Sequence, residues 1–152
     1  MDISKYLVKD EEKINLKKFP TACDSDDEEN KVKNDLMPKV LKEINKLQEK
    51  LFAENTYGML IVFQAMDAAG KDGTINHVFS HLNPAGVHVN SFKQPSVEEK
   101  DHDYMWRINK ALPSRGEIGI FNRSHYEEVI VAKIHDLIKS DGMPQDLIQK
   151  NI

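Results

Sequence analysis

The chain has 152 residues, of which 30% are charged, and its formal net charge is −4 at pH 7. This length suits one domain with a single core, and the slightly acidic balance argues against general nucleic-acid binding. The single cysteine, Cys23, excludes an internal disulfide and favours a reducing cytoplasmic compartment, and the absence of a signal peptide or of an apolar run of about 20 residues argues against membrane association.

The first 33 residues are expected to form a largely irregular extension, and the core domain is expected over residues 34–152. Within the extension, residues 24–29 read DSDDEE and hold five acids in six positions. Such a charge run favours a solvated linker, with an acidic metal site as the alternative.

The first regular elements are predicted from the spacing of apolar residues. Over residues 35–54 these recur at steps of three and four, which predicts an amphipathic helix. Pro38 fits its first turn, with Asn34 or Asp35 near the cap. The continuous apolar run over residues 57–65 predicts a strand covered on both faces.

The remaining elements alternate between helices and strands. Ser96 and Glu99 form a capping box at the start of one of the helices. The expected elements are a helix at residues 74–82, a strand at 87–92, a helix at 96–112, a turn at 113–116, a strand at 117–122 and a helix at 124–138. Their order, β-α-β-α-β-α with short links, predicts a parallel α/β sheet.

Residues 64–77, QAMDAAGKDGTINH, lie between an expected strand and an expected helix. This context is typical of a phosphate-binding loop, G-x-x-x-x-G-K-[ST], but Ala65 stands at the first glycine and Asp72 at the hydroxyl residue. In such a loop, backbone N–H groups and a lysine, here Lys71, point at one oxyanion. An ordinary βα turn with a solvent lysine is the alternative.

The glycines and acids of this loop have separate expected roles. Gly70 and Gly73 allow the backbone to approach a phosphate without a Cβ clash. Asp67 and Asp72 are candidate replacements for the missing Mg²⁺ ligand, because carboxylates suit that cation, and Thr74 offers a hydroxyl further along.

Further polar residues follow the other expected strands. Asn122 and Arg123 end the third strand and Lys93 follows the second, at the edge where open α/β sheets bind ligands. Arg123 could brace transferring phosphoryl oxygens, while Asn122 could instead serve as a helix cap. Taken singly, a cation such as Lys93 is most often a surface charge, but together with Lys71 and Arg123 these residues would form a group of converging cations. Trp106 is expected in the core, with base stacking as the alternative.

Three strings in the sequence, MDAAGKDGTI, NPAGVHVNSFKQPS and DHDYMWRINKALPSRGEIGIFNRSHYEEV, closely resemble the polyphosphate kinase 2 family. The resemblance covers about residues 47–138. It implies a P-loop kinase fold akin to thymidylate kinase, a three-layer α/β/α arrangement around a parallel sheet. It also implies Mg²⁺-dependent phosphoryl transfer between inorganic polyphosphate and a nucleotide. The FNRSHYE string resembles the branch that phosphorylates AMP and ADP.

The same resemblance implies roles for particular residues. Asp67 would organise Mg²⁺ and the attacking phosphate, and Lys71 and Arg123 would complete the catalytic group. Lys93 and Arg107 would line the same channel. The other residues expected at the phosphates or the nucleotide are Ala68, Ala69, Gly70, Asp72, Gly73, Thr74, Asn122 and Glu127.

The resemblance further implies a homo-oligomer, either a dimer or a tetramer. The chain is short for this family, because the lid would follow residue 138 and only three strands are predicted where about five are usual. We interpret the core as incomplete through C-terminal truncation. An incomplete gene product and a fragment completed by another chain are the alternatives.

Two other functions are consistent with the same loop. One is an ATP-using nucleoside monophosphate kinase, although adenylate-type kinases generally keep the first glycine of the pattern. The other is an inactive module that only binds phosphate. The sequence leaves the preferred nucleotide and the direction of transfer open.

Overall fold

The computed structural model describes residues 7–8, 13–15, 17 and 30–127. Contacts divide the chain into Met1–Lys39 and Val40–Ile152. The first unit contains the π-helix η3 (Val32–Leu36) and the first three residues of α2 (Met37–Glu54). The expected caps Asn34 and Asp35 therefore lie inside a helical segment, because Lys31 before η3 already has helical dihedrals and no side-chain cap.

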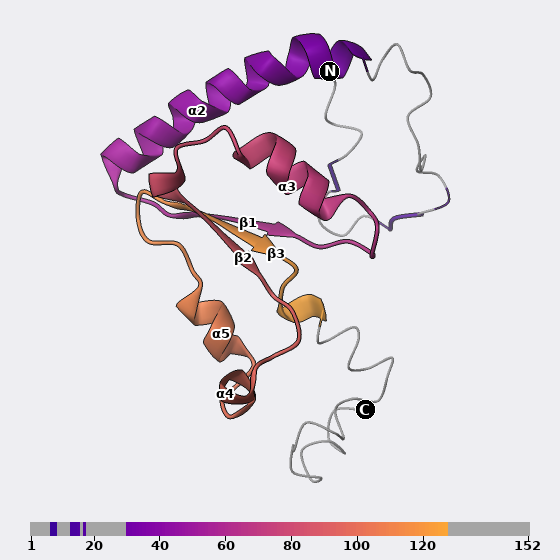
Figure 1. Ribbon diagram of the computed structural model, residues 1–152, viewed down its shortest axis with the longest axis vertical. Helices are drawn as coiled ribbons and strands as arrows, with labels where there is room; N and C mark the ends of the chain where they lie inside the picture. The colour runs from indigo at the N-terminus through magenta and orange to yellow at the C-terminus, as the bar shows by residue number, and fades with distance from the viewer. Residues whose placement is uncertain (1–6, 9–12, 16, 18–29, 128–152) are drawn as a thin grey trace. The chain divides into compact units, whose positions relative to one another are not determined.

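The second unit is built on a parallel sheet of three strands in the order β1-β3-β2 (Figure 1). The strands are β1 (Met59–Phe63), β2 (Val87–Ser91) and β3 (Ile118–Asn122), each inside its predicted range. The last strand in the sequence is thus the central one, and it pairs with both neighbours over its full length. The predicted parallel sheet is confirmed.

Helices cover both faces of this sheet (Figure 1). Helices α2 and α3 (Lys71–Phe79) lie on one face, and α4 (Val97–Lys100) and α5 (Met105–Lys110) lie on the other. Because side chains alternate along a strand, β3 serves both cores. Ile118 and Ile120 pack with Ile75 of α3, whereas Phe121 packs with Ile108 of α5. The predicted three-layer α/β/α architecture is confirmed.

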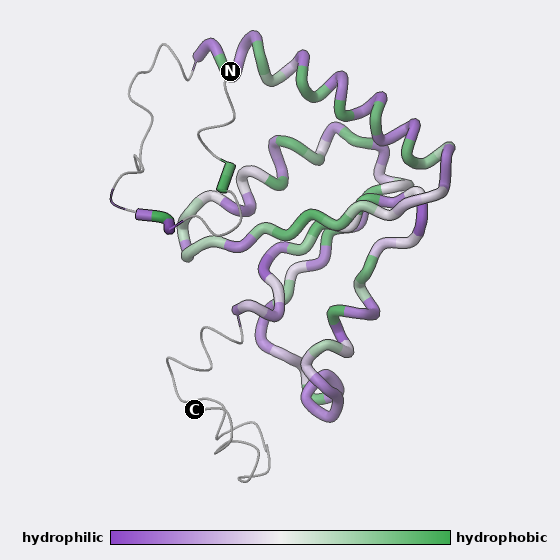
Figure 2. The backbone as a smooth tube through the Cα atoms, turned by 180° about the vertical axis from the view of Figure 1, so that it is seen from behind, coloured by the Kyte–Doolittle hydropathy of each residue, from purple (hydrophilic) through white to green (hydrophobic). Residues whose placement is uncertain are grey.

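The hydrophobic pattern follows these layers. Figure 2 shows a continuous apolar stretch along β1, while polar and apolar residues alternate along α2. On α2, Ile44 and Leu51 pack against the first core, as the three- and four-residue spacing predicts.

A buried amide joins α2 to the loop that precedes β2. Gln48 is only 2% exposed. Its Nε2 donates to the Asn83 carbonyl (2.8 Å), and its Oε1 accepts from the Asn83 N–H (3.0 Å). The short helix η4 (Pro84–Gly86) follows at once, and a Cβ on Gly86 would lie 2.9 Å from Gln48 Nε2. Both the glutamine and the glycine are needed for this contact, which the periodicity of α2 does not reveal.

Helix α3 begins three residues before its predicted start. Gly70 adopts a left-handed conformation (φ 83°) and serves as its N-cap, so the helix starts at Lys71 rather than at residue 74. The second half of the expected phosphate loop is consequently the first turn of a helix.

The helix predicted over residues 96–112 is interrupted, which corrects that expectation. The capping box is confirmed, because Ser96 N–H donates to Glu99 Oε2 (2.7 Å) and Glu99 N–H to Ser96 Oγ (3.2 Å). The chain then restarts at Asp103, whose carboxylate accepts from Met105 N–H (2.9 Å) and whose carbonyl accepts from Trp106 N–H (2.8 Å). An aspartate that binds its own downstream backbone favours a new helix start over a continuous helix.

Two expectations lie partly or wholly outside the described residues. The helix predicted over residues 124–138 is described only to residue 127, and the acidic run at residues 24–29 is not described. Across the described part of the chain, no helix is both long and apolar enough to cross a membrane.

We predict that Gln48→Leu destabilises the fold. The substitution removes both hydrogen bonds to Asn83, which contribute about 0.5–1.5 kcal/mol each, although the Asn83 carbonyl keeps its bond from the Gly86 N–H (3.1 Å). The free energy of unfolding from urea denaturation measures the loss. Glu49→Ala, at an exposed neighbouring position, is the control and should change it little. Equal stability of the two variants would contradict a structural role for the buried amide.

We also predict that Glu99 stabilises the fold only above its folded-state pKa. The Ser96 N–H, and then the Arg107 charge, lower the pKa of the Glu99 carboxyl. Stability from a lowered pKa is fully present above the unfolded value, about 4.3, and is lost as the pH falls through the folded value. Glu99→Gln should therefore lower the melting temperature at neutral pH and have little effect in strong acid. The exposed neighbour Glu98→Gln is the control, and a pH-independent loss would refute the assignment.

Candidate phosphate-binding site

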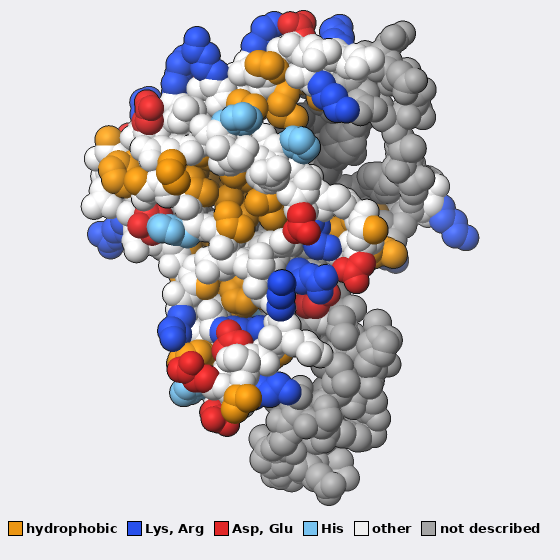
Figure 3. Space-filling view, viewed as in Figure 1, with side chains coloured by type: hydrophobic (Ala, Val, Ile, Leu, Met, Phe, Trp, Pro, Cys, Tyr) orange, Lys and Arg blue, Asp and Glu red, His pale blue; other side chains and the backbone are white. Residues whose placement is uncertain are grey.

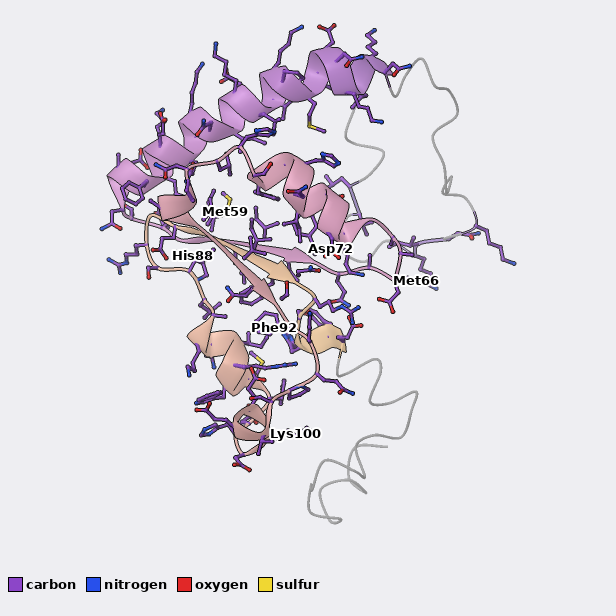
Figure 4. The ribbon with its side chains drawn as sticks, viewed as in Figure 1. Met59, Met66, Asp72, His88, Phe92 and Lys100 are labelled. Atoms are coloured by element: carbon purple, nitrogen blue, oxygen red, sulfur yellow. The ribbon has the colours of Figure 1, made fainter. Side chains whose placement is uncertain are left out.

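A cavity of about 660 Å³ opens at the carboxyl ends of the three strands. It is lined by residues 67–73, residues 91–94, Asn122 and Arg123, so the segments that follow all three strands contribute to it. Figure 4 labels Asp72 at the start of α3 and Phe92 just after β2, beside this end of the sheet.

The loop after β1 shapes one wall of the cavity. Ala68 (φ 62°) and Gly70 (φ 83°) both have positive φ angles, which turn the backbone sharply before α3. Around Gly70 and Gly73, no atom lies within 4 Å of where a Cβ would stand, so both residues border open space. The N–H groups of the first turn of a helix have no intrahelical partner and carry the positive end of its dipole. The wall therefore favours an anion.

The ammonium group of Lys71 lies across this loop. Its Nζ donates to the carbonyls of Ala65 (2.7 Å) and Met66 (2.9 Å). These bonds hold the positive charge of Lys71 beside the loop amides. Because both partners are neutral carbonyl groups rather than acids, the charge is available to an incoming anion.

Arg123 joins the loop to the end of β3. It has a positive φ of 70°, which costs about 1–3 kcal/mol for a residue other than glycine. Its N–H donates to the Phe63 carbonyl (3.0 Å), and its guanidinium donates to Asp67 Oδ1 (2.7 Å) and Glu127 Oε1 (3.0 Å). In Figure 3, Lys and Arg side chains lie next to Asp and Glu side chains at this end of the sheet.

Two residues that the sequence did not predict hold Glu127, the second acidic partner of Arg123, in place. Gln64 Nε2 donates to Glu127 Oε2 (2.6 Å), and the hydroxyl of the buried Ser124 donates to Gln64 Oε1 (3.3 Å). Gln64 follows β1 directly, so the rule that selects residues at strand ends could have found it. Ser124 has no comparable signal in the sequence.

Asn122 presents an unsatisfied acceptor within the cavity wall. Its Nδ2 donates to the Asp72 carboxylate, which fixes the orientation of the amide, because an oxygen there would face another oxygen. Among the described residues, its Oδ1 is the buried side-chain oxygen or nitrogen that has no hydrogen-bond partner. Such an atom needs an explanation, and a bound cation or its water ligand supplies one.

Lys93 and Arg107 meet at the other wall. Arg107 is 9% exposed, and its Nη1 donates to the Lys93 carbonyl (2.8 Å). Its guanidinium lies 5.4 Å from the centroid of the Phe92 ring and 3.8 Å from Glu99 Oε2. Lys93 lines the phosphate cavity, whereas Arg107 lines an adjoining cavity and supports the backbone of Lys93 from there.

The structure thus brings together most of the residues that the sequence predicts for this site. Thr74, Arg107 and Glu127 do not line the cavity, and Ser91, Phe92 and Gln94 line it without having been predicted. The predicted residues that do line it are Asp67, Ala68, Ala69, Gly70, Lys71, Asp72, Gly73, Lys93, Asn122 and Arg123.

Comparisons with known proteins identify relatives of this chain. The ADP-polyphosphate phosphotransferase of Rhodopseudomonas palustris is 45% identical over 140 residues, which cover 91% of this chain and 48% of that protein. The AMP/ADP-polyphosphate phosphotransferase of Meiothermus ruber is 40% identical over 149 residues, covering 97% and 54%. The chain therefore spans about half the length of the curated relatives it matches.

Solved structures give the same result. The crystal structure of Polyphosphate Kinase 2 from Arthrobacter aurescens aligns with a TM-score of 0.72 at 36% identity, over 81% of this chain and 45% of that one. A putative polyphosphate kinase 2 from Pseudomonas aeruginosa aligns with a TM-score of 0.65 at 27% identity. The family model for Polyphosphate kinase 2 (PPK2) matches residues 24–151, and the chain belongs to this family.

Proposed function

We propose that this chain takes part in Mg²⁺-dependent phosphoryl transfer between inorganic polyphosphate and a nucleotide, AMP or ADP, with ATP formation as the working direction. One observation carries the proposal. A cavity at the carboxyl ends of three parallel strands is walled by an anion-binding loop on one side and by Lys93 on the other, with Arg123 between them. The names of the relatives, which include AMP and ADP transferases, support the choice of acceptor.

The residues of the site divide the work of binding and positioning. The loop amides and Lys71 hold the end of the polymer, and Lys93 holds it from the opposite wall. Arg123 leaves its acidic partners to contact the oxygens of the transferring phosphoryl group. The acceptor phosphate attacks in line, so positioning and charge neutralisation supply most of the rate.

The residues present fit a magnesium ion. No group of three or more His, Cys, Asp or Glu side chains in the described chain could hold a metal. Magnesium is usually bound by only one or two carboxylates, with phosphate oxygens and water completing its shell. Asp67, at the edge of the cavity, would supply the carboxylate, and the unpaired Asn122 Oδ1 would bind a water of the shell. When bound, the ion offsets negative charge on the phosphoryl oxygens.

We further propose that the protein works in the cytoplasm as a homo-oligomer, a dimer or a tetramer. The single cysteine supports the reducing compartment. The oligomer is supported by apolar side chains that remain exposed on the edge strand β1, namely Met59, Leu60 and Val62.

The identity of the phosphoryl donor distinguishes this proposal from the two alternatives, an ATP-using monophosphate kinase and an inactive phosphate-binding module. With ADP and long-chain polyphosphate as the only donor, luciferase should detect ATP. An ATP-using monophosphate kinase would convert two ADP into ATP and AMP, so its ATP signal would persist when polyphosphate is omitted, whereas the proposed activity should give ATP only when polyphosphate is present. A binding module would bind polyphosphate, measured by calorimetry, without turnover.

We predict that Lys71→Ala and Asp67→Ala each abolish transfer and leave the fold intact. Loss of a group that neutralises transition-state charge typically lowers turnover by about 10²–10³. Polyphosphate-dependent ATP formation measures the effect, and circular dichroism checks the fold. Lys50→Ala, on the exposed side of α2, is the matched control for Lys71. Near-normal turnover in either site variant would exclude the assigned roles.

We also predict that Arg107 acts through Lys93 as a positioning residue. Arg107→Lys keeps the positive charge but loses the planar donor group that holds the Lys93 carbonyl. It should raise KM for polyphosphate, as Lys93→Ala should, and the double variant should be scarcely worse than Lys93→Ala alone. Full additivity in this double-mutant cycle would show that the two residues act independently.

A further inference from the structure

A connected set of hydrogen bonds joins the segment after β1 to the segment after β3. Arg123 donates to Asp67 Oδ1 (2.7 Å) and to Glu127 Oε1 (3.0 Å). Gln64 donates to the other oxygen of the same carboxylate, Glu127 Oε2 (2.6 Å), and accepts from the hydroxyl of Ser124 (3.3 Å). Glu127 therefore has two side-chain donors on separate oxygens, one charged and one neutral.

The Gln64 amide uses both of its ends in this set. Its Nε2 faces Glu127, because an ionised carboxylate only accepts hydrogen bonds. Its Oε1 faces Ser124, whose hydroxyl oxygen accepts from the Tyr126 N–H (3.2 Å) and whose hydrogen points to the amide. Ser124 is only 1% exposed, so this contact ties the amide to the protein interior. Position 64 thus needs a group that donates to Glu127 and accepts from Ser124.

The two donors of Glu127 differ in what they do during the proposed reaction. Arg123 lines the phosphate cavity and gives up its acidic partners when it contacts a phosphoryl group. Gln64 does not line that cavity, so a ligand there leaves its bond to Glu127 intact. A carboxylate that keeps one donor loses less when the other leaves than a carboxylate that is left with none.

We propose that Gln64 is a positioning residue, which holds and compensates Glu127 while Arg123 exchanges its acidic partners for the ligand. The inference rests on the proposed function, because it assigns a part in that reaction to a residue outside the phosphate cavity. Without the amide, Arg123 is the side-chain donor that remains to Glu127 among the described contacts. The resting ion pair is then favoured over the ligand.

The direction of the effect distinguishes this role from that of a simple anchor. An anchor would strengthen the hold of Glu127 on Arg123, so its loss would release Arg123 and tighten anion binding. A donor that compensates Glu127 predicts the reverse. Calorimetric titration of the full 152-residue chain with inorganic tripolyphosphate measures the difference.

Gln64→Leu should weaken tripolyphosphate binding by about two- to fivefold, the scale of an ion pair at partly exposed positions. Gln64 is exposed, so the variant should fold, and circular dichroism checks this. Equal or tighter binding in the folded variant would overturn the inference.

Gln64→Glu gives a readout that a purely structural role would not move. When ionised, the new carboxylate opposes Glu127 and offers Arg123 a further acid, so binding should be weaker than in Gln64→Leu. When protonated, it donates to Glu127 and accepts from Ser124, as the amide does. Because a neighbouring carboxylate raises the pKa of an acid, the ratio of wild-type to variant affinity should fall toward one from about pH 8 to about pH 5. The ratio for Gln64→Leu should stay constant, and a constant ratio for both variants would contradict the proposed role.

Each affinity is compared with that of the wild type at the same pH. The comparison removes the titration of tripolyphosphate and of the charged and titratable groups around position 64 that all the proteins share, namely Asp67, Arg123, His125 and Glu127. Asn109→Asp adds the same charge at an exposed amide residue outside the phosphate cavity. It is the matched control, and its ratio should stay near one at every pH.

Exchanging the two side chains tests whether they act on each other directly. In the double variant of Gln64→Glu with Glu127→Gln, the amide and the carboxylate change places, and one can again donate to the other. This variant should bind tripolyphosphate more tightly than Gln64→Glu alone, because two carboxylates no longer oppose each other. Single effects that simply add would show that the residues do not act as a pair, which would refute the inference.

The outcomes also separate this inference from the proposed function. If the wild type and Gln64→Leu bind tripolyphosphate equally well and both form ATP from polyphosphate, the role of Gln64 is refuted and the proposed function stands. If the wild-type chain does not bind tripolyphosphate, the proposed function is refuted, and the role of Gln64 fails with it.

Discussion

The site depends on the way β3 lies between β1 and β2 in an even parallel register. Phe63, Ser91 and Asn122 are aligned across the sheet, so all three strands end at one line. Backbone bonds continue the ladder one residue further, from Arg123 N–H to the Phe63 carbonyl and from Phe92 N–H to the Asn122 carbonyl. The peptide backbone itself thus places the segments after the three strands next to one another, before any side chain contributes.

The charges gathered there are balanced within the protein. Arg123 is shared between Asp67 and Glu127, and the Asp72 carboxylate accepts from Asn122. Lys71 differs, because its partners are carbonyl groups rather than acids. Converging cations would repel one another, and these contacts offset that repulsion. The consequence is that Arg123 must give up its ion pairs with Asp67 and Glu127 before it can bind a ligand. Because ion pairs at exposed positions are weak, that exchange is accessible to a multiply charged anion.

Much of this arrangement could be predicted from the sequence, because the relevant signals are local. A continuous apolar run located the first strand, an alternating β-rich pattern located the second, and the glycine and lysine pattern located the loop. The misses have physical causes. Helix α3 starts early because Gly70 is left-handed, a backbone state that periodicity does not report. The break between α4 and α5 comes from one side-chain bond of Asp103.

Contacts between distant segments were beyond such reasoning. Nothing near Gln48 indicates that its partner is Asn83, and nothing near Arg107 indicates that its guanidinium supports Lys93. Both pairings exist only once the sheet has set the helices in place. The cavity that Arg107 lines was missed for the same reason, because its walls come from the end of β2 and from α5, which no local pattern relates.

The strand order also governs how the protein can be made. Among the strands of residues 30–127, β1 and β2 are not neighbours, and each pairs with β3, which comes last of the three. As the chain emerges from the ribosome, neither earlier strand has its native partner until residues 118–122 have been synthesised. The sheet of these three strands therefore does not grow stepwise from its amino-terminal part, and its assembly awaits β3. During that interval two strands have unpaired edges, a state in which a nascent chain is prone to aggregation.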